Sequence, residues 1–231
     1  MLKANNFDSS NSLDIHLSQM LYNLIDQSIT EKGYSSIALS GGNTPLSLYK
    51  KLASKRIPWD KVQISIVDER FTYQDEFSNF KNIKNCFASN GKLSPVFFPL
   101  KFSQENRIPI LLEDKIKAPL PFDFLTLGMG EDGHFASIFP NLKSTNDLLS
   151  LESCKEIEVV KTNNQHKYRF TFNLNSILKS KRIFLIIKGR KKISLLNKII
   201  ENDATNLKFK EMPIIALLKQ RKVDIELFQA K

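Results

Sequence analysis

The sequence predicts an α/β fold in which a mainly parallel sheet carries helices on both faces, with a smaller β-containing part after about residue 150. Three observations predict it. Short apolar segments that suit buried strands alternate along the chain with segments whose leucines recur at helical spacing. Glycine-containing turns follow two of the predicted strands, at residues 40–45 and 128–134. No repeat or low-complexity linker divides the chain, so we expect one domain over residues 1–231.

The first elements follow from local pattern. Leucines recur at helical spacing from Leu13 to Leu24 and predict an amphipathic helix that ends near Gly33. A short strand at 36–39 leads through a glycine loop into a second helix, and Pro45 suits the first turn of that helix. The chain therefore opens with a helix and then a strand–loop–helix unit.

The same periodicities assign the rest of the chain. Up to residue 117 we expect a strand at 62–67, a helix that follows Ser78-Asn79 and ends at Phe87, a strand or extended segment at 93–100 and a helix at 103–117. A strand at 122–127 and a polar loop or short helix at 144–153 come next, followed by a hairpin of strands at 157–160 and 167–172. The chain then continues with a buried strand at 183–187, a helix after Gly189 and a last strand at 223–227.

Composition places the chain among ordinary globular proteins. Apolar residues make up 42% of the 231 residues and charged residues 25%. Two cysteines, Cys86 and Cys154, are too few for a disulfide framework and lack metal-ligand spacing, so we expect free thiols. No apolar run is long enough to span a bilayer, and no signal-type segment follows Lys3. We therefore expect a cytoplasmic protein with no membrane partner.

The net charge of +10 is unevenly distributed. Residues 1–150 hold 16 basic and 16 acidic side chains, whereas residues 151–231 hold 18 and 8. This excess fits attraction of an anionic small substrate, a nucleic-acid surface or simple solvation by lysine. Solvation explains most of these lysines, and without an RNA-type aromatic motif or zinc-finger spacing we expect no nucleic-acid partner.

The loop at residues 40–45, Ser-Gly-Gly-Asn-Thr-Pro, is a candidate phosphate site. N–H groups at a helix start, together with the positive end of the helix dipole, bind phosphate, and glycines let the anion approach the backbone. The candidate residues are Gly41, Gly42, Asn43 and Thr44. The loop lacks the lysine of a Walker loop and the spacing of a dinucleotide fingerprint, and a tight capped turn would explain it equally well.

Charged residues are crowded at the end of the next strand, in Asp68-Glu69-Arg70. An arginine in this place can make paired contacts with phosphate or carboxylate, and the two acids can orient it. A surface salt bridge is the simpler explanation of the same residues.

The segment FDFLTLGMGEDGHFASIFP at residues 122–140 carries the candidate catalytic group. An apolar strand ends in a turn that contains three glycines, and His134 follows that turn. Ligands of open α/β sheets lie beyond the carboxyl ends of strands, so this imidazole is placed for chemistry. Glu131 and Asp132 are the acids that can fix its tautomer and orientation.

With these three segments, the chain resembles the 6-phosphogluconolactonase family, the sugar-phosphate lactonases of the oxidative pentose phosphate pathway. The resemblance rests on LSGGNTPLSLYKKLA, on DKVQISIVDERF with a later Ser-Asn, and on the segment around His134. It continues weakly through Arg169, the turn from Gly189 to Lys192 and MPIIALL, and so covers nearly the whole chain.

The resemblance also has a competitor and two departures. Glucosamine-6-phosphate deaminases resemble the same segments, but they have an aromatic residue in place of Arg70 and Asn-Glu-Pro after Gly-His. Here Phe135 stands where the lactonases commonly have threonine, and Asn43 where they usually have serine. A sugar-phosphate sensor without catalysis is the alternative of another class, although binding alone would not need His134 with Asp132.

The resemblance implies hydrolysis of 6-phospho-D-glucono-1,5-lactone to 6-phospho-D-gluconate. A histidine accepts and returns protons near neutral pH, so His134 would activate the attacking water and then protonate the leaving ring oxygen, with Asp132 orienting it. Direct water attack is expected rather than an acyl-enzyme on Ser137, which lacks a nucleophile elbow. The phosphate is expected on the glycine loop and on basic residues with Asp68 nearby. These substrate-binding candidates are Gly41, Gly42, Asn43, Thr44, Asp68, Arg70, Arg169 and Lys192.

No cofactor and no metal are expected. His16, His134 and His166 are not spaced as ligands, and the acids beside His134 serve better as orienting groups. The expected partner is the sugar-phosphate lactone itself, bound by a monomer or a weak homodimer.

Overall fold

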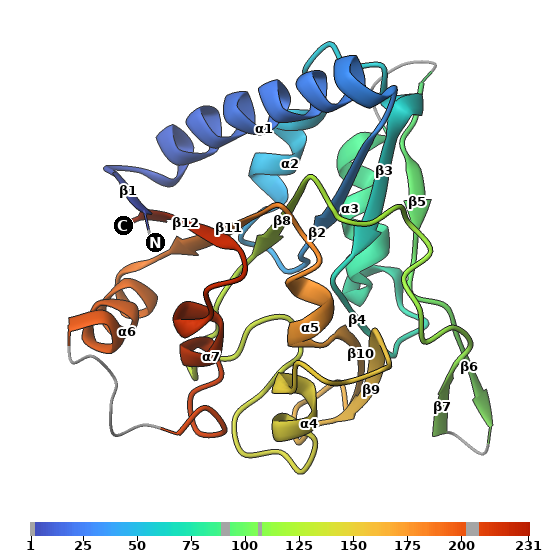
Figure 1. Ribbon diagram of the computed structural model, residues 1–231, viewed down its shortest axis with the longest axis vertical. Coiled ribbons are helices and arrows are strands. Elements are labelled where there is room, and N and C mark those ends of the chain that lie inside the picture. Colours follow the sequence, from blue (N-terminus) through green and yellow to red (C-terminus); the bar gives the residue numbers. More distant parts are fainter. Residues whose placement is uncertain (1–2, 89–92, 106–107, 202–207) are drawn as a thin grey trace.

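A computed structural model describes residues 3–88, 93–105, 108–201 and 208–231 of the chain. Its centre is a sheet of seven strands in which every neighbouring pair is parallel (Figure 1). In spatial order the strands are β1 (Lys3–Phe7), β12 (Asp224–Ala230), β11 (Arg182–Lys188), β8 (Phe124–Leu127), β2 (Ser35–Leu39), β3 (Val62–Ile66) and β5 (Val96–Phe98). The predicted parallel sheet is confirmed.

Helices cover both faces of this sheet, as predicted. In Figure 1 α1 and α2 lie above the sheet, and α5 and α7 lie below it. One apolar core holds side chains of α1 (Ser10–Lys32), α2 (Leu46–Ala53) and α3 (Asn79–Phe87). The other holds side chains of α5 (Leu174–Ile177), α6 (Arg190–Glu201) and α7 (Ile214–Lys219). Among the described residues no helix is both long and apolar enough to cross a membrane.

The strands divide their side chains between the two cores because successive residues point to opposite faces. In β2, Ile37 and Leu39 face the core under α1, whereas Ala38 faces the other core. α1 in turn buries a stripe of leucines, begins at the cap Ser9 and ends at Gly33, whose φ of 83° suits glycine. The spacing of apolar residues in the sequence therefore agrees with their burial in this part of the chain.

Smaller antiparallel sheets lie beside the main one. β4 (Asp68–Arg70), β10 (Tyr168–Phe172) and β9 (Ile157–Lys161) form one of them, in the order β4-β10-β9. The predicted hairpin of β9 and β10 is confirmed, and β4 joins it directly after β3. The short helix α4 (Thr145–Leu149) precedes β9 in the chain. Helical turns of the 3-10 type lie at Trp59–Lys61 and Asp75–Phe77.

The helix predicted at 103–117 is wrong. The chain forms β6 (Phe102–Glu105) and β7 (Ile108–Leu111), which pair as an antiparallel hairpin. Pro109 lacks the N–H of a helix interior, and the β-branched Ile108 and Ile110 suit a strand. The sequence also did not predict β1, a polar strand at the edge of the sheet, or the short helices α5 and α7.

Candidate active site

A cavity of about 300 Å³ opens at the carboxyl edge of the main sheet. The segments that follow β2, β3 and β8 reach it, and β10 and α6 complete its wall. Eight residues singled out from the sequence line this cavity: Gly41, Gly42, Thr44, Asp68, Arg70, His134, Arg169 and Lys192. Segments far apart in the chain thus meet at one place, as the rule for parallel sheets requires.

His134 and Asp132 form a directly bonded pair. The distance between His134 Nδ1 and Asp132 Oδ1 is 2.5 Å, and the backbone N–H of His134 donates to the same oxygen at 3.2 Å. A carboxylate at Nδ1 favours the tautomer whose proton lies on that nitrogen, which leaves Nε2 free to accept a proton. Asp132 itself does not line the cavity, and it contacts the lining residue His134.

The turn that carries His134 requires glycine. The backbone N–H of Gly130 donates to the carbonyl of His134 at 2.8 Å, and a side chain at Gly130 would place its Cβ 2.2 Å from the imidazole. Phe139 packs against the imidazole ring, with ring centroids 4.4 Å apart. The imidazole is therefore held by packing as well as by Asp132.

The carboxyl of Asp132 is ionised more readily than an ordinary aspartic acid. Partial burial alone would raise its pKa, but the hydrogen bonds and the charge of His134 outweigh burial and hold the pKa below its usual value. The side chain of Asp132 remains 48% exposed. At neutral pH it is thus an anion available to stabilise a positively charged imidazole.

Two arginines face each other on the floor of the cavity. Arg70 on β4 and Arg169 on β10 are directly opposite in the antiparallel register. Arg169 is only 8% exposed, and burial together with the charge of Arg70 lowers its pKa. The Nε atoms of both are buried without a hydrogen-bond partner in the described structure. Like charges opposite each other destabilise a sheet, although the charges of Asp68 and Glu69 act on the pKa of Arg169 in the opposite direction.

Glu69 fixes the position of Arg70. Its carboxylate accepts hydrogen bonds from the backbone N–H groups of Arg70 at 2.7 Å and of Asn79 and Phe80 at 2.8 Å, and from the hydroxyl of Ser78 at 2.9 Å. Burial raises the pKa of Glu69, although these four donors act against the rise. The carboxylate thus ties β4 to the start of α3.

Asn79 connects this region to the glycine loop. Its side chain accepts from the N–H of Gly42 at 3.3 Å and donates to the carbonyl of Asp68 at 2.8 Å. Only glycine fits at Gly41, where a Cβ would lie 2.0 Å from Asn79 Cγ, and Gly42 has a φ of 84°. The loop is therefore shaped by its contact with α3.

A buried ion pair supports the other side of the loop. Lys188, at the end of β11, donates to Asp14 on α1 at 2.6 Å and to the carbonyl of Thr44 at 3.0 Å. Asp14 also accepts a hydrogen bond from Ser47, in the first turn of α2, at 2.5 Å. The cation thus joins α1, β11 and the start of α2.

The structure does not bring every candidate into the cavity. Asn43 is exposed and lies outside the lining. Sequence reasoning gave no binding role to Asn79 or Ser137, which both line it. Ser137 is buried and its hydroxyl donates to Asp68 at 2.7 Å. Its position three residues after His134 was the available signal.

The described residues contain no group of three or more histidine, cysteine, aspartate or glutamate side chains that could hold a metal ion. The groups that line or adjoin this cavity are a histidine–carboxylate pair, two arginines, a lysine and polar groups. Such a set suits proton transfer to and from a substrate that carries negative charge.

Comparison with known proteins gives a consistent result. A family model described as glucosamine-6-phosphate isomerases/6-phosphogluconolactonase matches residues 8–225. A 6-phosphogluconolactonase of Helicobacter pylori is 32% identical over 233 residues, which cover 97% of each chain. One from Caulobacter vibrioides is 25% identical over 237 residues, which cover 100% of this chain and 98% of the relative.

Solved structures agree. The crystal structure of a 6-phosphogluconolactonase from Shewanella baltica has a TM-score of 0.87 and 27% identity, and covers 100% of this chain and 98% of that chain. A monomeric glucosamine-6-phosphate deaminase has a TM-score of 0.75 at 19% identity, and covers 99% of this chain and 97% of that chain. This second likeness shows the fold alone.

Proposed function

The chain belongs to the glucosamine-6-phosphate isomerase/6-phosphogluconolactonase family, and from this premise we propose that it hydrolyses 6-phospho-D-glucono-1,5-lactone to 6-phospho-D-gluconate. One observation carries the proposal within the family: His134, bonded to Asp132, lines the same cavity as the opposed Arg70 and Arg169. The histidine supplies acid–base chemistry, and the arginines supply a place for phosphate.

The phosphate lies against the two arginines and the glycine loop. Arg70 already uses one Nη atom on the carbonyl of Phe77, at 2.8 Å, which fixes its direction. Lys192, in the first turn of α6, adds a third cation to the cavity, and the N-terminus of α2 contributes the positive end of its dipole. A doubly charged group in this place relieves the repulsion between the arginines.

His134 acts twice in the reaction. Its Nε2 takes a proton from a water molecule, whose oxygen attacks the lactone carbonyl and gives a tetrahedral anion. The imidazolium, stabilised by the Asp132 carboxylate, then returns the proton to the ring oxygen as the C–O bond breaks. A positioned acid–base group of this kind accelerates a reaction by about 10²- to 10⁴-fold.

Ser137 positions Asp68 and is not the nucleophile. Its hydroxyl donates to the carboxylate of Asp68, and both side chains are buried at the cavity wall. A hydroxyl committed to a carboxylate orients that acceptor, and Asp68 can in turn accept hydrogen bonds from hydroxyl groups of the sugar acid. Water attack therefore remains the proposed route.

Hydrolysis of freshly prepared 6-phosphoglucono-δ-lactone, measured against its spontaneous hydrolysis, tests the function. We expect rapid turnover, and a lower kcat/KM for glucono-δ-lactone, which lacks the phosphate. Ammonia release from glucosamine 6-phosphate is the control assay, and we expect none. Ammonia release without lactone hydrolysis would assign the chain to the deaminases, and binding of 6-phosphogluconate without either reaction would make it a sensor.

A further inference from the structure

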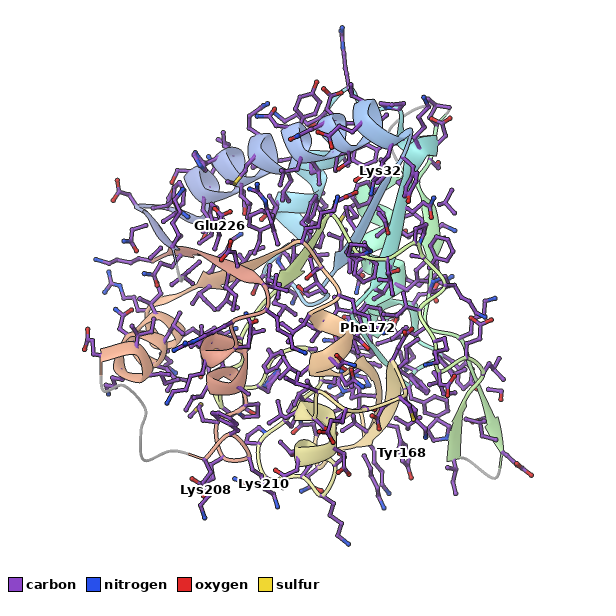
Figure 2. All side chains as sticks on the ribbon, in the orientation of Figure 1. Lys32, Tyr168, Phe172, Lys208, Lys210 and Glu226 are labelled. Carbon is purple, nitrogen blue, oxygen red and sulfur yellow. The ribbon has the colours of Figure 1, made fainter. Side chains whose placement is uncertain are left out.

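A second cavity, of about 390 Å³, shares no lining residue with the candidate active site. Its floor is the pair of strands β3 and β5, and its roof includes Ile157 on β9 and Phe172 on β10, which pair with each other. Figure 2 shows Phe172 and Tyr168 at opposite ends of β10, with Phe172 toward the interior. None of the roles proposed above uses this space.

A small residue, Ser65, lies at the floor of this cavity. Ser65 on β3 pairs with Ala38 on β2 and with Phe98 on β5, and these residues form one row across three strands. Of this row, Ser65 and Phe98 line the cavity. Most of its wall is apolar, with Phe98, Leu100, Ile116, Ile157 and Phe172, whereas the ring of Phe97 packs against Phe80 and Phe87 in the other core.

One polar group in this cavity has no partner. Ser65 is 2% exposed, and its hydroxyl oxygen makes no hydrogen bond within the described part of the chain. A buried hydroxyl without a partner costs free energy, and such groups are rare in folded proteins. A ligand oxygen that accepts from Ser65 would remove this cost.

The rim of the cavity is positively charged. Lys101, Lys115 and Lys117 line it with a single acid, Glu113. Lys101 lies 3.8 Å from Glu113, and Lys115 donates to the carbonyl of Cys154. No ion pair of Lys117 is found among residues 3–88, 93–105, 108–201 and 208–231. This lysine can therefore meet the charge of an anionic ligand.

From the aromatic wall, the unpartnered Ser65 hydroxyl and the lysines of the rim, we propose that this cavity binds a small aromatic carboxylate. Its size lies within the range of small-molecule sites, which are mostly apolar with a few placed polar groups. The ring packs against Phe98 and Phe172, and the carboxylate both accepts from Ser65 and pairs with the lysines of the rim. The site is independent of the lactonase proposal.

Calorimetric titration of the full chain with 2-naphthoate tests this site. We expect binding that persists in saturating 6-phosphogluconate and that is at least fivefold tighter than binding of the uncharged 2-naphthalenemethanol. Ser65→Leu fills the cavity and should abolish binding. Ser65→Ala removes only the hydroxyl and should weaken binding about fivefold, the usual effect of one hydrogen bond.

A pair of charge-reversing variants tests the contribution of the positively charged rim, one at the rim and one as a matched control. Lys117→Glu should weaken naphthoate binding about tenfold at low salt, whereas Lys222→Glu, in the exposed turn before β12, should leave it unchanged. The proposal is overturned if wild-type protein does not bind naphthoate, if 6-phosphogluconate displaces it, or if folded Ser65→Ala and Lys117→Glu variants bind as tightly as wild type.

Discussion

At the scale of single residues, the juxtaposition of Arg70 and Arg169 is the most informative feature. A buried arginine and a half-buried one directly across a strand pair repel each other, Asp68 and Glu69 offset part of this repulsion at Arg169, and an anion between the two guanidinium groups would make the interaction attractive. The sequence indicated each arginine separately. It could not indicate that they face each other, because the pairing depends on the register of strands distant in the chain.

Arg169→Met tests this arrangement without substrate turnover. Methionine keeps an apolar stem but removes the charge, so we expect inorganic phosphate to stabilise the variant much less than wild type. Phosphate at a hundredfold excess over its Kd adds about 2.7 kcal/mol to wild-type stability, a rise in Tm of about 5 °C or more.

The control for this melting experiment is Arg182→Met, at the exposed start of β11, where the side chain lies 3.7 Å from Glu226. That variant should respond to phosphate as wild type does. An equal response of Arg169→Met would show that the anion binds elsewhere.

At the scale of elements, the ends of strands and helices are placed by a few buried polar contacts. Lys188 at the end of β11 holds both Asp14 and the carbonyl of Thr44. The sequence pattern identified β11 as a buried strand and α1 as an amphipathic helix, but Asp14 lies on the buried face of that helix. The reason for an acid in this place became visible only when its partner was located.

Lys188→Met should destabilise the protein by about 3–5 kcal/mol, because it leaves the Asp14 carboxylate buried without its cation. Urea denaturation measures the loss. Lys181→Met is the matched control, since its partner Asp123 keeps Lys32 at 2.8 Å, and it should cost less than about 1 kcal/mol. Equal losses in the two variants would contradict the role given to Lys188.

Helices and strands were predictable where apolar residues recur at one spacing, either that of a helix or that of a strand. The strand–loop–helix unit at β2 and α2 and the strand β8 were found because their apolar patterns match their burial on the two cores. The hairpin of β6 and β7 was missed because its residues show no clear alternation and lie half exposed. β1 was missed because a polar edge strand has no apolar signature, although its register with β12 is complete.

In the candidate site, too, some contacts could be predicted from the sequence and others could not. His134 and Asp132 are two residues apart, so their contact could be predicted from the chain alone. The contacts of Asn79 with Gly42 and of Ser137 with Asp68 join segments from different strands, and only the assembled sheet brings them together.

At the scale of the whole molecule, the two ends of the parallel sheet differ in role. The cavity lies at the carboxyl ends of the strands. At the opposite ends, Asp123, just before β8, connects several elements. Its carboxylate accepts from Lys32 at 2.8 Å, Lys181 at 3.0 Å, the hydroxyl of Ser35 at 3.1 Å and the N–H of Ser36 at 3.0 Å. Helix α1, strand β2 and strand β11 thus meet at one anion.

This anion makes stability depend on pH. Burial alone would raise the pKa of Asp123, but the hydrogen bonds from Lys32, Ser36 and Lys181 hold it below the usual value. A carboxyl with a lowered folded-state pKa contributes stability above the unfolded-state pKa of about 3.9, and this contribution is lost as the pH falls through the folded-state pKa.

We therefore expect Asp123→Asn to be less stable than wild type at pH 7 and to lose less stability than wild type on acidification below about pH 5. Urea midpoints measured from pH 7 to pH 3 show how the stability of wild type and of Asp123→Asn depends on pH. Asp26→Asn, on the exposed side of α1, is the control and should follow the wild-type curve. A parallel loss in Asp123→Asn would show that other groups carry the acid dependence.

The central claim is that His134 performs the acid–base chemistry of a lactonase, and one comparison tests it most directly. The initial rate of 6-phosphoglucono-δ-lactone hydrolysis, corrected for spontaneous hydrolysis, is measured for wild type and for His134→Ala over a range of substrate concentrations. We predict that kcat falls by about 10²- to 10⁴-fold while KM changes little, since the phosphate contacts remain. A variant that keeps the wild-type kcat would contradict the assignment of His134.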